Sequence, residues 1–209
     1  MVSITHSGEN LFRLNQILST AQKHFAMYGL EKSTMREIAS DLNISKGALY
    51  YYFSDKEQLY KAVVEKEQEE FIQLLTEKLS QMSDPGEMFR EYIEIRMKYF
   101  RNMLNLSRFR LQDFRNLKPL IGDTWLQFQT KEVEIIEQIL NEGIKQNIFF
   151  IEKPNEVAQL FLNILKGLRK NEFHEKELFY LNEDEYTGLV YRTFEFVKIF
   201  IKGLKYKEN

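Results

Sequence analysis

The residues from 45 to 53 read SKGALYYYF, and they place a hydroxyl, an ammonium group and three phenols in one short segment. If the segment is a helix, Ser45 can cap its amino end or offer its hydroxyl to a phosphate, and Lys46 adds positive charge there. Gly47 and Ala48 have little or no side chain, so they allow another backbone to approach closely. This combination is typical of a helix that contacts nucleic acid.

The three consecutive tyrosines continue the same chemistry. Leu49 and Phe53 are four residues apart and are expected to face the core, which turns Tyr50, Tyr51 and Tyr52 variously toward DNA or its backbone. Phenolic hydroxyls can donate to phosphate, and the rings can contact thymine methyl groups or sugars. The run can also be partly core, since tyrosine often buries its ring and exposes its hydroxyl. Tyr50 is expected to be the most buried of the three.

Two short capped helices are predicted around this segment. Thr34 and Glu37 have the spacing of a capping box, in which the hydroxyl and the carboxylate satisfy amides at a helix start. Asn43 and Ile44 form a tight break, and Ser45 caps the second helix. Two short helices joined by a tight turn form a helix-turn-helix, whose second helix fits the major groove of DNA.

A longer helix is expected on each side of this unit. Apolar residues recur at helical spacing from Leu11 to Tyr28, and Gly29 suits the left-handed residue that ends such a helix. Ser54 and Glu57 repeat the capping-box spacing and open a long helix that reaches about Leu79. Lys56, in its first turn, can hold another phosphate.

The remainder of the chain is also predicted to be helical. A helix follows the break at Pro85, a shorter one spans about Phe109 to Leu117 and stops near Pro119, and Gly122 and Asp123 restart the chain. Further amphipathic stripes predict three long helices, at about 125–147, 154–168 and 185–205. The predicted fold class is therefore all-α.

Composition agrees with a globular helical protein. The 209 residues include 44% hydrophobic residues, only 3 Pro and 9 Gly, and no Cys, so disulfides and thiolate chemistry are excluded. A net charge of −2 argues against indiscriminate coating of nucleic acid but allows a local contact patch. The sequence lacks a secretory signal and an apolar run long enough to span a membrane, so a cytoplasmic protein is expected.

An enzyme is the main competing class. The three histidines, His6, His24 and His174, lie in different segments, and no zinc-ligand spacing involves them. A GxSxG elbow and a phosphate-binding glycine loop are both missing. No catalytic residue, metal site or cofactor is predicted.

The run TMREIASDLNISKGALYYYFSDKEQLYKAV resembles the DNA-binding region of the TetR family of bacterial regulators, and the similarity covers roughly residues 11–64. Tyr52 departs from the histidine common at its position. The resemblance implies about nine helices, with a DNA-binding domain at 1–55 and a ligand-binding and dimerisation domain at 56–209. It places family DNA contacts at Thr34, Ser45, Lys46, Gly47, Ala48, Tyr50, Tyr51, Tyr52 and Lys56.

The resemblance also implies a function and its partners. We expect a regulator, a repressor released from a palindromic operator by a small apolar or aromatic ligand, that forms a homodimer through its last two long helices. The apolar faces of these helices fit equally with packing inside one chain. A protein partner, or a role in chromosome organisation without any small ligand, is the alternative. The lysine-rich last helix also allows membrane-surface binding, but a subunit interface uses its apolar residues better.

A basic run in the middle of the chain suggests where a ligand could bind. Residues 96–118 hold seven basic residues and one acid, interleaved with aromatic residues. One hypothesis is a pocket for an anionic amphiphile; the alternative is a solvated helix face whose stems pack on apolar surface. Aromatic residues suit a ligand pocket and an ordinary core equally. The candidate ligand-binding residues are Arg96, Phe100, Arg101, Arg108, Trp125 and Phe128.

Overall fold

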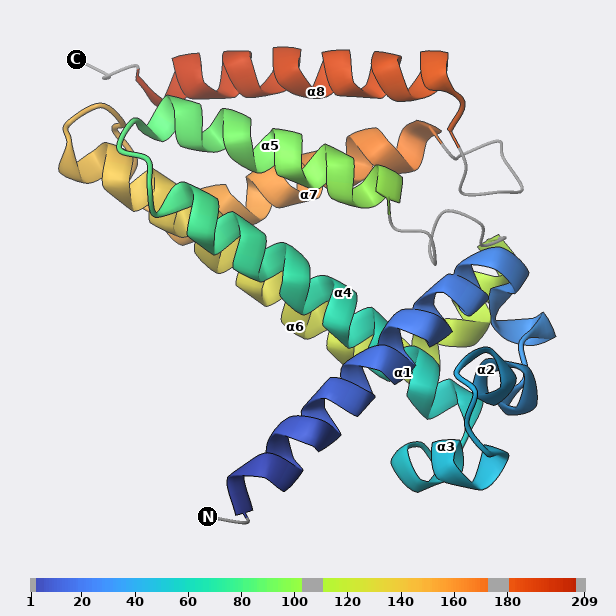
Figure 1. The fold of residues 1–209 in the computed structure, drawn as a ribbon. Coiled ribbons are helices and arrows are strands. Elements are labelled where there is room, and N and C mark those ends of the chain that lie inside the picture. The colour runs from blue at the N-terminus through green and yellow to red at the C-terminus, as the bar shows by residue number, and fades with distance from the viewer. Residues whose placement is uncertain (1–2, 103–110, 173–180, 206–209) are drawn as a thin grey trace.

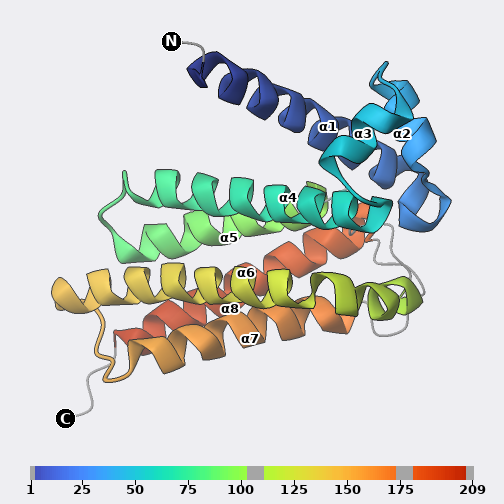
Figure 2. The same ribbon diagram turned by 90° about the horizontal axis from the view of Figure 1, so that it is seen from below.

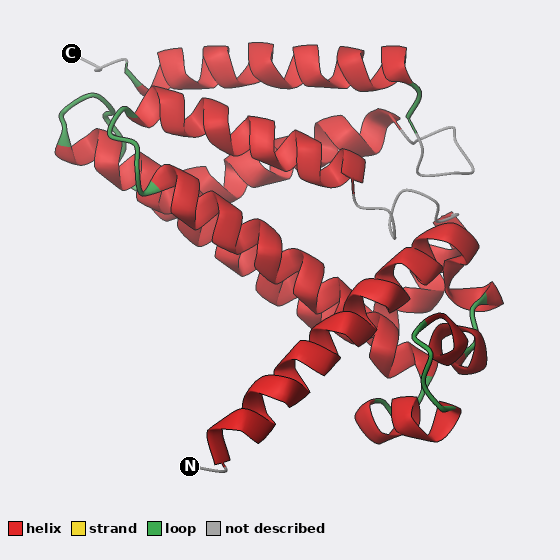
Figure 3. Ribbon diagram, viewed as in Figure 1, coloured by secondary structure: helices red, strands yellow, loops and turns green. Residues whose placement is uncertain are grey.

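The computed structural model describes residues 3–102, 111–172 and 181–205, and all regular structure in these ranges is helical (Figure 3). In chain order the helices are α1 (Ser3–Lys32), α2 (Met35–Asp41), α3 (Lys46–Tyr52), α4 (Lys56–Leu79), α5 (Pro85–Asn102), α6 (Leu111–Lys145), α7 (Pro154–Glu172) and α8 (Glu183–Leu204). The predicted all-α fold class is confirmed.

The helices form two groups joined by α4 and α6. Helices α1, α2 and α3 gather at one end, and the N-terminal half of α1 extends away from the rest of the chain (Figures 1 and 2). Helices α4 and α6 contact each other along their lengths and lead from this end to α5, α7 and α8. A movement of α4 would therefore displace residues in both groups of helices.

Each group has its own hydrophobic core. The core of the first group contains Ile17, Ile38 and Leu49, and the start of α4 contributes Leu59 and Val63. The core of the second group contains residues from α5 to α8 together with the later part of α4, including Phe71, Leu75, Phe89, Ile136, Phe161 and Val197. Helix α4 is thus a shared element of both cores.

Local capping signals explain where the short helices begin. The capping box of Thr34 and Glu37 is present at the start of α2, and Ser45 caps α3 by accepting a bond from the Ala48 amide, so both predictions are confirmed. The capping box predicted at Ser54 was wrong. The N-cap of α4 is Asp55, whose carboxylate accepts a 2.7 Å hydrogen bond from the Gln58 amide.

The predicted stop near Pro119 was also wrong. Helix α6 continues through Pro119, so one long helix replaces the two that were expected, and eight helices are described instead of about nine. A proline inside a helix costs a hydrogen bond and a steric clash. Just beyond it, Leu120, Ile121 and Trp125 pack against the core of the first group, and this tertiary packing overrides the local penalty.

Gly29 ends the regular part of α1, as the sequence predicted. Its φ of 78° and ψ of 163° lie in a region that is essentially restricted to glycine. The chain turns here, and Ser33 Oγ donates a 2.6 Å hydrogen bond to the Gly29 carbonyl oxygen. Helix α2 is thereby brought back beside α1.

Replacing Gly29 with alanine is expected to destabilise the protein by roughly 1–3 kcal/mol, because a Cβ forces this backbone conformation into strain. The loss would come from the backbone alone, since an added Cβ meets no atom within 4 Å. Gly122→Ala in α6 is the matched control: its Cβ also meets nothing within 4 Å, but its backbone is helical, so a gain of about 0.5–1 kcal/mol is expected. Urea unfolding at equal protein concentration measures both, and equal effects would contradict the argument.

Candidate DNA-binding surface and effector site

The turn between α2 and α3 is held by backbone hydrogen bonds around Asn43. This residue has a left-handed φ of 54°, which asparagine tolerates better than most side chains. The Asn43 amide donates to the Ser40 carbonyl at 3.0 Å, and the Ile44 amide donates to the Ala39 carbonyl at 3.0 Å. Together these bonds form a Schellman motif, which fixes the angle at which α3 leaves α2.

Helix α3 is anchored through Leu49, which is fully buried. Phe53, one turn further on, is half-buried and packs against the same core, as predicted. The opposite side of α3 is in contact with solvent and carries most of the predicted DNA-contact positions: Ser45, Lys46, Gly47, Ala48, Tyr50 and Tyr51. Because one side of α3 is held in the core by a buried residue, its exposed polar side can contact the major groove of DNA while the helix stays packed.

The exposed groups of α3 can donate hydrogen bonds. Because Ser45 Oγ accepts from the Ala48 amide, its own hydroxyl proton remains available for a phosphate oxygen. The Lys46 ammonium lies 5.3 Å from the centre of the Tyr50 ring. This cation–π contact holds the Lys46 side chain along the exposed face of α3. Tyr51 is 81% exposed, the most accessible of the three tyrosines.

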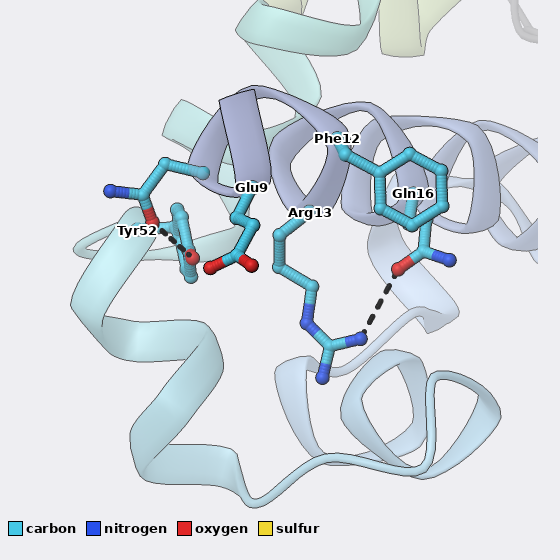
Figure 4. A pocket seen from close by; sticks show the side chains of 6 residues that line it. Glu9, Phe12, Arg13, Gln16 and Tyr52 are labelled. Atoms are coloured by element: carbon cyan, nitrogen blue, oxygen red, sulfur yellow. Dashed lines mark hydrogen bonds between the residues drawn. The ribbon is translucent and has the colours of Figure 1, made fainter. Parts of the chain in front are cut away.

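Tyr52 is the most buried of the three tyrosines, so the expectation for Tyr50 was wrong. Tyr52 turns toward α1, where its hydroxyl donates a 3.3 Å hydrogen bond to Asn10 Oδ1 (Figure 4). Tyr50 is 42% exposed, and its ring contacts the Lys46 ammonium instead. The cleft beside Tyr52 is lined by Glu9, Asn10, Phe12, Arg13 and Gln16 of α1.

Like Tyr52, two more of the predicted contact residues have partners within the chain. The Lys56 ammonium donates to the carbonyl oxygens of Leu30 at 3.0 Å and Glu31 at 3.3 Å, so it closes the end of α1. Thr34 Oγ1 accepts from the Glu37 amide and donates to its carboxylate at 2.7 Å. A phosphate would have to displace the bond from the Thr34 hydroxyl to Glu37, whereas the Lys56 ammonium keeps a third N–H for a phosphate oxygen.

His24 links α1 to α2. Its ring is buried, and Nδ1 lies 2.9 Å from Asp41 Oδ2. The contact positions α2, and no local pattern in the sequence predicts it. In the described ranges, no group of three His, Cys, Asp or Glu side chains is placed to hold a metal ion.

A cluster of aromatic rings lies where the two cores meet. Tyr99 of α5 packs against Phe71 of α4 at 4.3 Å between ring centres, and its ring centre is 5.4 Å from that of Phe100. Phe128 of α6 lies 6.2 Å from Tyr99, and Trp125 lies 5.8 Å from Phe128. We call these five residues the aromatic cluster. It lies against α4, the helix shared by both cores.

Charged and polar groups border the aromatic cluster. Arg96 Nε donates to Glu132 Oε1 at 2.9 Å, and the Tyr92 hydroxyl donates to the same oxygen at 2.9 Å. The side chains of Arg96 and Glu132 are almost completely buried. The Arg169 guanidinium from α7 lies 4.1 Å from the centre of the Phe100 ring.

The structure gathers four of the six predicted ligand-binding residues. Arg96 stacks on Phe100 at 4.5 Å, and Trp125 and Phe128 belong to the aromatic cluster. Arg101 lies elsewhere: it is exposed, pairs with Glu183 and stacks on Tyr186 of α8. Arg108 lies outside the described residues.

Sequence reasoning missed Arg169, Glu132 and Tyr99 as part of this site. Arg169 directly follows the predicted helix at 154–168, where a basic residue of the last turn resembles ordinary helix surface. A charged residue at a position of the apolar stripe, as Glu132 is between Phe128 and Ile135, is the one available signal.

None of the helices in the described part of the chain combines the length and the apolar character needed to cross a membrane.

Comparison with known proteins identifies the family. The family model described as bacterial regulatory proteins, tetR family, matches residues 17–63, which include α2, α3 and the start of α4. A probable acrEF/envCD operon repressor from Escherichia coli K12 is 30% identical over 94 residues. That match covers 44% of this chain and only 42% of the repressor.

Two solved structures extend the likeness to the whole chain. A transcriptional regulator from Cytophaga hutchinsonii is 36% identical, and the match covers 93% of this chain and 99% of that one with a TM-score of 0.83. A TetR-family regulator from Pectobacterium atrosepticum, at 21% identity, has the same fold over 97% of this chain and 98% of its own, with a TM-score of 0.73. By its helix-turn-helix sequence and by its full-length similarity to a known regulator, the chain belongs to the TetR family of bacterial transcriptional regulators.

Proposed function

We propose that this chain is a DNA-binding repressor that acts as a homodimer and leaves its operator when a small, largely apolar or aromatic molecule binds at the aromatic cluster. The observation that carries the DNA-binding part is the free face of α3, which presents Ser45, Lys46, Tyr50 and Tyr51 while Leu49 anchors the helix. Repression is proposed because the similar E. coli protein is a probable operon repressor.

We assign DNA binding to residues 1–55 and effector binding and dimerisation to residues 56–209. The boundary falls at the start of α4, whose first turns pack in one core and whose later turns pack in the other. Because α4 is continuous, an effector that displaces its later turns also moves the helix-turn-helix.

Large apolar side chains exposed on the last two helices support a subunit interface there. Leu160 of α7 and Tyr191 and Ile199 of α8 are exposed in the single chain although they are large and apolar. Gly167 of α7 is also exposed, and an added Cβ there would meet no atom within 4 Å. Two copies packed through α7 and α8 would bury these residues in a four-helix interface.

A dimer gives the effector a way to control DNA binding. Two recognition helices must lie about 34–36 Å apart to enter successive major grooves of a palindromic operator. An effector that wedges between α4 and its neighbours would change that separation, and both half-sites could no longer be engaged together.

The Lys46→Ala variant tests the DNA-binding surface. If Lys46 holds one phosphate in each subunit, the substitution should weaken binding to all DNA sequences alike and reduce the salt dependence of log K by about 1 for each phosphate that is no longer neutralised. Fluorescence anisotropy with operator and unrelated duplexes, over a range of salt concentrations, measures both effects.

Lys145→Ala is the matched control. It removes the same charge from an exposed position at the end of α6 that lies far from α3 (Figure 1). The control is expected to leave the salt slope unchanged. A Lys46→Ala slope equal to that of Lys145→Ala would remove Lys46 from the interface.

A further inference from the structure

Arg96 and Arg169 share one aromatic ring but differ in their partners. Their guanidinium carbons lie 4.5 Å and 4.1 Å from the centre of the Phe100 ring. Arg96 has its counter-ion in Glu132, at 2.9 Å. Arg169 has no ion pair and no hydrogen bond with any residue that the structure describes; its contact is the ring.

The surroundings of Arg169 disfavour the charged form of its guanidinium. Burial lowers the pKa of Arg169 to about 10, the neighbouring positive charge of Arg96 acts in the same direction, and Glu132 and Tyr99 oppose the shift. At neutral pH the guanidinium therefore stays protonated. It is a half-buried cation, and the neighbouring carboxylate, Glu132, is already bonded to Arg96 and Tyr92.

A second donor without a partner lies in the same region. The Tyr99 hydroxyl is buried and has no hydrogen-bond partner in the described structure. Burial, reinforced by the negative charge of Glu67, raises the pKa of Tyr99, so the hydroxyl keeps its proton and acts as a donor. Two donors that lack an acceptor among the described residues, beside an aromatic surface, are the arrangement expected of a site that receives an anionic ligand.

We propose that the effector is an organic anion, a carboxylic acid with an aromatic or acyl body, and that Arg169 binds its carboxylate. The Tyr99 hydroxyl supplies a second hydrogen bond, and the body of the ligand lies against Phe71, Phe128 and Trp125. The proposal rests on the proposed function in that it names the chemical class that the effector site accepts. A neutral ligand would leave the Arg169 charge uncompensated, which gives the site its selectivity.

The single tryptophan of the chain makes direct detection possible. Trp125 belongs to the aromatic cluster, so a ligand in the site should change its fluorescence. The full-length protein is titrated with dodecanoate and 1-dodecanol, and with 4-phenylbutanoate and 4-phenylbutanol, pairs that share a body and differ in charge. At least one carboxylate is expected to bind about 10- to 100-fold more tightly than its alcohol, the range for a hydrogen bond to a charged group.

Variants of Arg169 and its neighbours test whether the preference for the carboxylate comes from Arg169. Arg169→Gln is expected to remove the preference for the carboxylate while leaving the affinity for the alcohol unchanged, and Tyr99→Phe should reduce it several-fold. Lys170→Gln, which removes the same charge from the exposed neighbouring position, should behave as the wild type. Equal binding of acid and alcohol, an unchanged preference in Arg169→Gln, or no response to either carboxylate would each overturn the proposal.

A parallel operator-binding measurement separates this inference from the proposed function. If a carboxylate binds through Arg169 and operator affinity does not change, the anion site stands and effector-controlled repression fails. If the alcohols release the operator as well as the acids do, regulation stands and the anion site fails. Operator affinity of Arg169→Gln without ligand is measured beside that of the wild type, so that release by ligand is compared with each protein's own ligand-free affinity.

Discussion

Replacing Arg96 with methionine is expected to lower the free energy of unfolding by roughly 3–5 kcal/mol. The substitution leaves the Glu132 carboxylate, which is 1% exposed, without its counter-ion at 2.9 Å. Tyr92 would still donate to Glu132, but a hydroxyl does not neutralise the charge. Urea unfolding at fixed protein concentration, with the slope checked for a change in cooperativity, measures the loss.

Two further variants give this prediction its control. Arg101→Met breaks an exposed ion pair with Glu183, and screening by water limits its effect to about 0–1 kcal/mol. The double variant Arg96→Met, Glu132→Leu removes both buried charges and should recover most of the stability that the single variant lacks. Similar effects of Arg96→Met and Arg101→Met would show that the buried pair contributes no more than a surface one.

The sequence predicted best the features that depend on neighbouring residues. The box of Thr34 and Glu37, the cap at Ser45 and the end of the helix at Gly29 each involve side chains and amides within a few positions, so spacing alone identified them. The anchor at Leu49 followed from helical periodicity in the same way. The free face of α3 was therefore foreseeable.

The features that failed depend on contacts between distant segments. Helix α6 continues through Pro119 because its neighbours find places in the core of the first group. Tyr52, and not Tyr50, is the most buried of the three consecutive tyrosines because α1 offers Asn10 as a partner. None of these partners is visible from local spacing.

The surroundings of the aromatic cluster show the same division between what local sequence predicts and what it does not. Residue type alone suggests Arg96, Phe100, Trp125 and Phe128, and packing brings them to one place. Arg101 has the same chemistry as Arg96, but it points to the surface and pairs with Glu183. The position of Arg169 beside Phe100 depends on the crossing of α5 and α7, which no pattern within either helix encodes.

Replacing both Leu160 and Ile199 with glutamate is expected to convert the protein to a monomer and to weaken operator binding by about 100-fold or more. Both side chains are exposed in the single chain, at 57% and 69%, so the substitutions should leave the fold of each subunit intact. In a dimer packed through α7 and α8 they would place four uncompensated carboxylates in a buried interface. Sedimentation measures the mass, and anisotropy with a palindromic operator measures the affinity.

Leu126→Glu is the control for this prediction, because Leu126 is 64% exposed on α6, outside the two last helices. It should remain dimeric and keep its operator affinity. Binding to a single half-site separates failure of dimerisation from damage to α3: the double variant should bind a half-site as each wild-type subunit does, because the contacts of one recognition helix are unchanged. A monomer that binds the full operator as tightly as the wild type would contradict control through the spacing of two recognition helices, since a single helix would then supply all of the affinity.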